Sequence, residues 1–183
     1  MATSRSNIDR KNIKHRGLYA GKEQELTGIV KLSAGGSLAT TDLLQMIPLG
    51  ENVRPIRMTL MATPVSGTPV LTGGAFNCGV IPFDDVPFKR ADGTEYPAIP
   101  TSATALGTFT LPTGQPLLNS VASNRPVANS VPRYAPYRVT LTPGAAFSVA
   151  GGDIELSLTV VFLGEQIAEP YVYTDFLNPK VAN

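Results

Sequence analysis

The sequence predicts an all-β fold, either a sandwich or a barrel. Two segments, 53–63 and 151–164, alternate apolar and polar residues at strict period two, as half-buried strands do. Six weaker strand candidates lie between clusters of Gly, Pro, Ser and Asn. Amphipathic helical periodicity nowhere persists beyond two turns. Strands separated by turns are therefore the only regular pattern in the chain.

The 183 residues suit one domain with extensions. We expect an arm over 1–22 and a β-sandwich domain over 23–183, with a Pro-rich insertion around 82–136. Charged residues make up 16% of the chain, against about 25% in a typical soluble protein. A surface so poor in charge predicts coverage by other subunits, and self-assembly is the simplest form of it.

The first 22 residues form a basic arm. They carry six Lys or Arg and one Asp, a net charge of +5. The remaining residues carry nine Lys or Arg and thirteen Asp or Glu, a net charge of −4. This asymmetry indicates an interaction tail, although a solvated terminus without a partner is an alternative. The predicted contact residues are Arg5, Arg10, Lys11, Lys14, Arg16 and Lys22.

The first predicted strands cover 26–32, 42–49 and 53–63. Residues 40–47 could instead begin a short helix, but Pro48 would interrupt it. In 53–63, Pro55 is expected to mark the beginning of the strand or an edge. The face expected toward the core carries Ile56, Met58, Leu60 and Ala62, and the opposite face carries Arg57, Thr59, Met61 and Thr63.

The later predicted strands are 76–83, 106–111, 137–142, 145–150 and 151–164. The last is the clearest, since glycines close it at both ends. Its expected core face carries Ile154, Leu156, Leu158, Val160 and Phe162, and its expected water face carries Asp153, Glu155, Ser157, Thr159 and Val161.

The residues needed for an enzyme site are scarce. The lone Cys78 lies on the apolar side of a predicted strand and is interpreted as core filling. The lone His15 lies in the arm, which leaves no credible nucleophile and base pair. Asp84 and Asp85, with the nearby Asp92 and Glu95, lack the spacing of an EF-hand loop. We therefore expect no catalysis, no cofactor and no metal.

The sequence contains no phosphate-binding loop motif and no apolar run of membrane-spanning length. The glycine pairs in 33–37 and 71–76 lack the Lys and the Ser or Thr of a phosphate-binding loop, and are expected to form hairpin turns. The densest apolar run has eight residues, too few for a membrane span of about 18.

Tyr134 and Tyr137, beside Arg133 and Arg138, form the best candidate binding surface outside the arm. Such residues stack on single-stranded nucleic acid or on sugars. Tyrosines packed on the sandwich or on a neighbouring subunit are the favoured interpretation, since Tyr is enriched at protein interfaces. The apolar C-terminal segment 165–183 is a second candidate assembly contact.

Residues 25–70, "ELTGIVKLSAGGSLATTDLLQMIPLGENVRPIRMTLMATPVSGTPV", resemble the small virion proteins of tailed double-stranded DNA bacteriophages. The shared features are an early strand, an apolar step ending in I-P-L-G-E-N-V, and a strand of alternating residues. The resemblance implies a jelly-roll-like antiparallel β-sandwich that decorates or cements a capsid. It also implies oligomers, often trimers, on the capsid surface of a virion made in the host cytoplasm. It transfers no functional residue.

The composition predicts an assembling β-sandwich, and the resemblance implies a structural virion protein that contacts a major capsid protein and copies of itself. The apolar residues spaced through the basic arm favour an extended tether on neighbouring subunits over a nucleic-acid grip, which would carry denser Arg and Lys. The alternatives are a shell-forming coat or collar protein, or a glycan-binding β-sandwich module. A hydrolase is the remaining and least supported class.

Overall fold

The computed structural model describes residues 3–5, 23–49, 53–82, 102–126 and 137–164, and all regular structure in these residues is β. The described strands are β1 (Thr3–Arg5), β2 (Glu23–Leu32), β3 (Ser37–Leu38), β4 (Leu43–Leu49), β5 (Val53–Pro64), β6 (Val70–Thr72), β7 (Ala75–Pro82), β8 (Ser102–Thr110), β9 (Ser120–Asn124), β10 (Tyr137–Pro143), β11 (Phe147–Ala150) and β12 (Ile154–Gly164).

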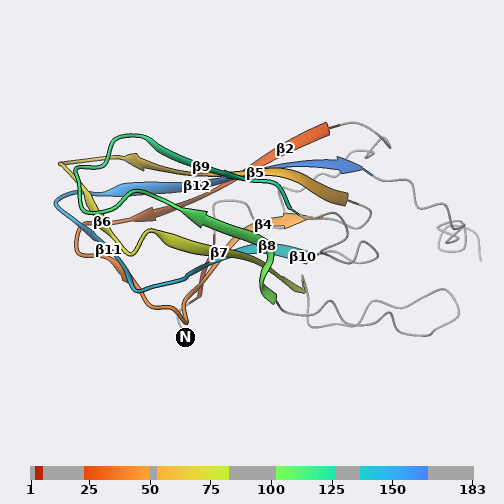
Figure 1. Ribbon diagram of the computed structural model, residues 1–183, viewed down its shortest axis with the longest axis horizontal. Helices are drawn as coiled ribbons and strands as arrows, with labels where there is room; N and C mark the ends of the chain where they lie inside the picture. Colours follow the sequence, from red (N-terminus) through yellow and green to blue (C-terminus); the bar gives the residue numbers. More distant parts are fainter. Residues whose placement is uncertain (1–2, 6–22, 50–52, 83–101, 127–136, 165–183) are drawn as a thin grey trace, which may run out of the picture.

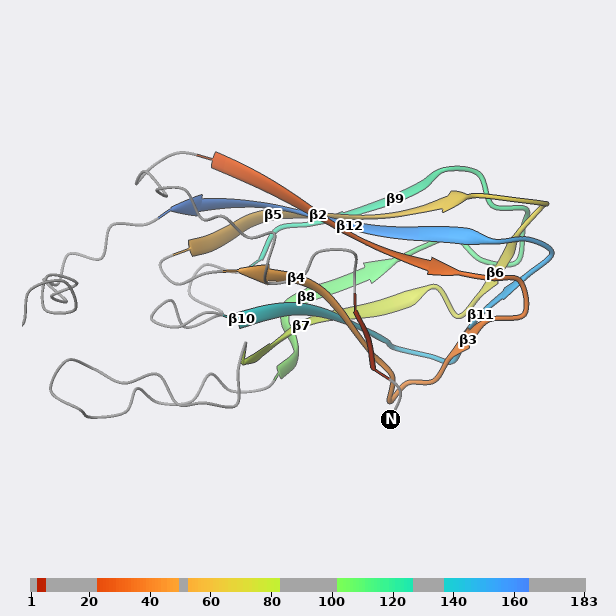
Figure 2. The same cartoon turned by 180° about the vertical axis from the view of Figure 1, so that it is seen from behind.

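Two sheets stack face to face, as Figure 1 shows and Figure 2 confirms from behind. One has the strand order β2-β12-β5-β9, and the other has the order β1-β4-β10-β7-β8. A small sheet, β3-β11-β6, joins them at one end. Along the chain, the main strands pass repeatedly from one sheet to the other. This arrangement of strands is a jelly roll, so the predicted fold class is confirmed.

The core fills the space between the sheets. The rings of Phe76 and Phe147 lie 5.0 Å apart at an interplanar angle of 59°, a tilted geometry that aromatic pairs favour. Cys78 is fully buried, with its Sγ 3.8 Å from the Sδ of Met58 on the facing sheet. The interpretation of Cys78 as core filling is confirmed.

Strand β12 has the predicted inner face and a different outer face. Its five expected core residues are at most 1% exposed. On the expected water face, however, Ser157 and Val161 are also buried, at 6% exposure each. The physical reason is the position of β12 between β2 and β5, whose outward side chains flank its own on both sides.

A β-bulge changes the predicted face of β5. The register with β12 shifts between Val161 and Phe162, so Phe162 pairs with Pro55 and Ile56 is the extra residue. Ile56 is therefore only partly buried, and Val53 and Pro55 are buried instead. A bulge reverses which residues face inward, and this reversal explains the wrong prediction for Ile56. Pro55 lies inside the strand, where β9 does not pair with β5.

The glycine pairs form corners between sheets, and the prediction of hairpin turns is wrong. Gly35 and Gly36 follow β2, but β3 pairs with β11, while β2 pairs with β12. Gly73 joins β6 of the small sheet to β7 of the five-stranded sheet. Its φ is +72°, and a Cβ there would collide with the carbonyl oxygen of Ala146. Only glycine fits this close approach of two chain segments.

The strand predictions are otherwise confirmed for all eight segments, including 42–49, which is β4 and not a helix. The Pro-rich region is more structured than a single loop, because β8 and β9 lie within it and belong to the two main sheets. Strand β9 was not predicted, since its sequence, SVASN, lacks apolar alternation. Residues 83–101 and 127–136 lie outside the described residues.

Candidate interaction surfaces

The outer face of the four-stranded sheet is the first candidate surface. Its residues form rows across the strands β2, β12, β5 and β9 in that order. We call this surface the outer face and define it by Glu25, Thr27, Ile29 and Lys31 of β2, Glu155, Ser157, Thr159 and Val161 of β12, Arg57, Thr59, Met61 and Thr63 of β5, Val121 and Ser123 of β9, and the adjoining Arg125.

A row of hydroxyl groups crosses the middle of the outer face. Thr27 and Thr159 are register partners, and their Oγ1 atoms are hydrogen-bonded at 2.8 Å. Thr59 and Ser123 are also partners, with their hydroxyl oxygens 3.4 Å apart. Because these groups bond to one another across the strands, they keep partners when water is removed from the face.

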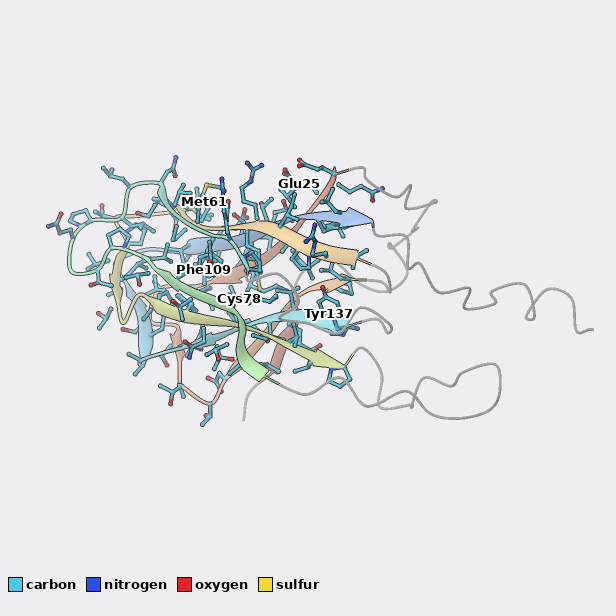
Figure 3. The ribbon with its side chains drawn as sticks, turned by 45° about the vertical axis from the view of Figure 1, so that its right-hand side comes forward. Glu25, Met61, Cys78, Phe109 and Tyr137 are labelled. Atoms are coloured by element: carbon cyan, nitrogen blue, oxygen red, sulfur yellow. The ribbon has the colours of Figure 1, made fainter. Side chains whose placement is uncertain are left out.

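An apolar row lies beside the hydroxyl row. It consists of Ile29, Ser157, Met61 and Val121, in strand order. Val121 is 59% exposed and Met61 is 36% exposed, whereas Ser157 between Ile29 and Met61 is buried. The side chains of this row therefore project little from the sheet at β12 and further toward β9. In Figure 3, Met61 and Glu25 lie on the outer side of the sheet, and Cys78 and Phe109 lie between the sheets.

One row of the outer face carries charges of opposite sign at its two ends. Glu25 is exposed on β2, and Arg57 is exposed on β5 in the same row, with Val161 between them. Arg125 follows β9 directly, one step beyond the Met58–Asn124 register pair, and is exposed. The β2 side of this row is thus acidic, and its β5–β9 side is basic.

The turn end is the second candidate surface, formed by the turns 33–36, 65–69, 112–119 and 151–153. Asp153 connects three of them. Its Oδ1 accepts a hydrogen bond of 2.9 Å from the Ala34 amide, and its carbonyl oxygen accepts one of 2.9 Å from the Val65 amide. Its own amide donates to the Ser66 hydroxyl at 3.2 Å.

Two large apolar side chains project from the turn end. Leu118 is 78% exposed and Val65 is 55% exposed. The loop that carries Leu118 is anchored by a 2.7 Å hydrogen bond from the Leu117 amide to the Pro69 carbonyl oxygen. The apolar side chains are therefore presented on anchored turns, an arrangement suited to contact with another protein.

The structure places few of the predicted site residues. Arg5 lies in β1, which pairs parallel with β4 of its own chain, from Thr3 opposite Leu43 to Arg5 opposite Gln45. The start of the arm thus joins its own sheet, since the edge of β4 offers unpaired backbone groups. Arg10, Lys11, Lys14, Arg16, Lys22 and Tyr134 lie outside the described residues, as does the C-terminal segment 165–183.

Tyr137 packs on its own sandwich, which is one of the two contacts favoured for the loop tyrosines, and it does not form part of an exposed binding surface. It begins β10 between Leu49 and Pro82, and its side chain is 0% exposed. It therefore packs in the core and presents no ring to a partner. Its neighbour Arg138 is also buried, at 9% exposure.

Within the described residues, neither Cys78 nor the acidic side chains form an arrangement suited to catalysis or metal binding. Burial raises the pKa of the Cys78 thiol well above its usual range, which disfavours the thiolate that nucleophilic chemistry needs. No group of three or more His, Cys, Asp or Glu that could hold a metal lies within the described ranges. The acidic cluster from Asp84 to Glu95 lies outside them. No helix in the described part of the chain is long and apolar enough to cross a membrane.

The outer face was not recognised as a site from the sequence. The alternation in 53–63 and 151–164 places Met61 and Thr159 outward, and this was the available signal. The identity of the neighbouring strands, which assembles the rows, cannot be read from local pattern.

Among solved structures, the chain resembles one described as the capsid of Ralstonia phage GP4. The TM-score is 0.52 at 15% sequence identity, and the match covers 91% of this chain and 100% of the other. At this identity the likeness concerns the fold. No protein-family model matches the sequence, and no curated protein matches it.

Proposed function

We propose that the protein is a structural component of a bacteriophage virion. The observation that carries the proposal is the likeness in fold to a phage capsid chain over the whole length of that chain. The resemblance of residues 25–70 to small phage virion proteins points to the same class by a separate route. The jelly roll also suits the role, since viral capsid domains commonly use it.

Within this class, we propose that the protein decorates or cements the outside of a capsid. Residues 25–70 support this choice, because many of the proteins they resemble have that role. The low charge content and the apolar turn end, with Leu118 and Val65, supply surfaces suited to contact with a major capsid protein. A shell-forming coat or a collar component is the alternative, and the likeness in fold supports it equally.

A glycan-binding module is less well supported than a virion protein. It depended on Tyr134 and Tyr137 forming one platform, and the burial of Tyr137 removes half of it. We propose no enzymatic function, because the sequence offers few residues that could form a pair of nucleophile and base.

The decisive experiment is the copy number of the chain in purified particles, by quantitative mass spectrometry against the major coat protein. We expect hundreds of copies in a simple ratio to a different coat protein. An abundant host cytoplasmic protein, measured in the same samples, controls for carry-over. About a dozen copies would assign the protein to the neck or tail instead, and absence from particles would overturn the virion proposal.

A further inference from the structure

We propose that the outer face pairs with the same face of a second copy of this chain. The two copies are related by a twofold axis that runs parallel to the strands, between β12 and β5. This inference goes beyond the virion role and does not depend on it. Its basis is the self-complementarity of the rows described above.

Such an axis reverses the strand order and leaves each row opposite itself. Strand β2 then faces β9 of the partner copy, and β12 faces β5. Ile29 lies over Val121 of the partner copy, so two apolar side chains meet. The buried Ser157 lies under the projecting Met61 of the partner copy, so the long side chain fills the space above the short one. A twofold interface makes each of these contacts twice.

One pair of charges is complementary under the same operation, while Arg57 lies over Val161 of the partner copy. Glu25 on the acidic side of one copy lies over Arg125 on the basic side of the other. The opposite alignment, with the axis perpendicular to the strands, would also bring unlike charges together, with Glu25 over Lys31 of the partner copy, but it would place the apolar row over the hydroxyl row. The contact between the apolar rows of the two copies therefore selects the parallel axis, because only that axis brings them together.

Desolvation of the middle of the face costs little. The hydroxyl row meets itself, with Thr27 over Ser123 and Thr159 over Thr59 of the partner copy. Thr27 and Thr159 already share a 2.8 Å hydrogen bond within each copy, and Thr59 and Ser123 share a longer one of 3.4 Å. Short, satisfied side chains permit the close approach that face-to-face sheet packing requires, about 10 Å between sheets.

The size of the face predicts a weak pair. Six residue steps along β2 span about 20 Å, and four strands span about 19 Å, a footprint on the order of 400 Å². Stable interfaces bury about 800 Å² on each partner. We therefore expect association at micromolar concentrations in solution, strengthened where a particle holds copies close together.

Sedimentation velocity of the full chain over a range of concentrations tests the pairing. The unaltered chain is expected to shift from monomer to dimer in the micromolar range. Glu25→Arg places arginine over arginine at both charge pairs, and Arg125→Glu places acid over acid, so each should weaken the dimer at least tenfold. Gln115→Arg, at the exposed turn end, is the control and should leave the dimer unchanged.

Recombining the charges makes the test specific for the proposed axis. The double variant Glu25→Arg with Arg125→Glu should dimerise again. An equimolar mixture of the two single variants should form a heterodimer, because both charge pairs are then of unlike sign. Circular dichroism and thermal melting verify that each variant is folded.

Three outcomes would overturn the proposal. A chain that is monomeric at all accessible concentrations does not use the face for self-association. A trimer, as the sequence resemblance implies, excludes a twofold pair. A dimer that survives both single charge reversals forms through another surface.

Discussion

Asp153 acts at the scale of a single residue, because it ties together turns that lie far apart in the sequence. Its carboxylate binds the Ala34 amide, and its backbone binds Val65 and Ser66. The sequence pattern predicts only that Asp153 lies on the water face of a strand. The bonds are invisible to local pattern because their partners are 87 and 119 residues away.

We predict that Asp153→Ala lowers the free energy of unfolding by about 1 to 2 kcal/mol, since it removes a charge-assisted acceptor from the Ala34 amide. Asp153→Asn keeps an acceptor oxygen at the same position and should retain most of the stability. Urea unfolding followed by circular dichroism measures both. Equal losses in the two variants would show that the hydrogen bond to Ala34 is not the cause.

At the same scale, Tyr137 and Cys78 show the limit of reading single residues. Both are fully buried. The core position of Cys78 followed from its alternation with Phe76 and Val80. Tyr137 was instead assigned by its proximity to prolines and arginines, which says nothing about the direction of its ring.

At the scale of an element, β5 shows how one bulge changes the meaning of a pattern. The alternation predicts the same face for Ile56 and Leu60, but only Leu60 is fully buried. The bulge at Ile56 lets Val53 and Pro55 fill the core at that end of the strand. An extra residue in a strand depends on its partner strand, which the local sequence does not contain.

We predict that Leu60→Ala destabilises the fold by about 2 to 5 kcal/mol, the range for a buried Leu. Ile56→Ala, a truncation of similar size at a partly buried site, should cost about half as much or less, because it removes less buried surface. Urea unfolding of both variants gives the comparison. Equal costs would mean that Ile56 belongs to the core and that the bulge lies elsewhere.

At the scale of the whole molecule, the jelly roll places its features at distinct sites. The turn end presents Leu118 and Val65, and the outer face presents the self-complementary rows. The strands that border the segments outside the described residues, such as β7 ending at Pro82 and β10 beginning at Tyr137, meet at the opposite end. Separate surfaces would let one subunit contact a capsid and a second copy together.

The basic arm belongs to this scale, since we propose that it tethers the subunit to its neighbours on a particle. Deletion of residues 1–22 should leave the sandwich folded, because β1 contributes only three residues at a sheet edge. Binding to particles that lack the protein should weaken, since an extended arm adds contacts at high effective concentration. Co-sedimentation with such particles measures the effect.

Two controls accompany the arm deletion. Hydrogen exchange should increase at the β4 edge, where β1 is lost, and should stay unchanged in β12. A variant with the six basic residues changed to Gln tests whether charge or backbone length provides the binding. Unchanged particle binding by the deletion variant would make the tether proposal wrong.

The all-β class, the positions of eight strands and the inner face of β12 could be predicted from the sequence, because alternation at period two is a local property of the chain. The tertiary structure alone decided which strands are neighbours, where β5 bulges and how the glycine corners join the sheets. It also decided that Tyr137 faces the core and that the outer face combines residues of four strands. These features arise from pairing between segments distant in the sequence, and the closing of two sheets around one core selects that pairing.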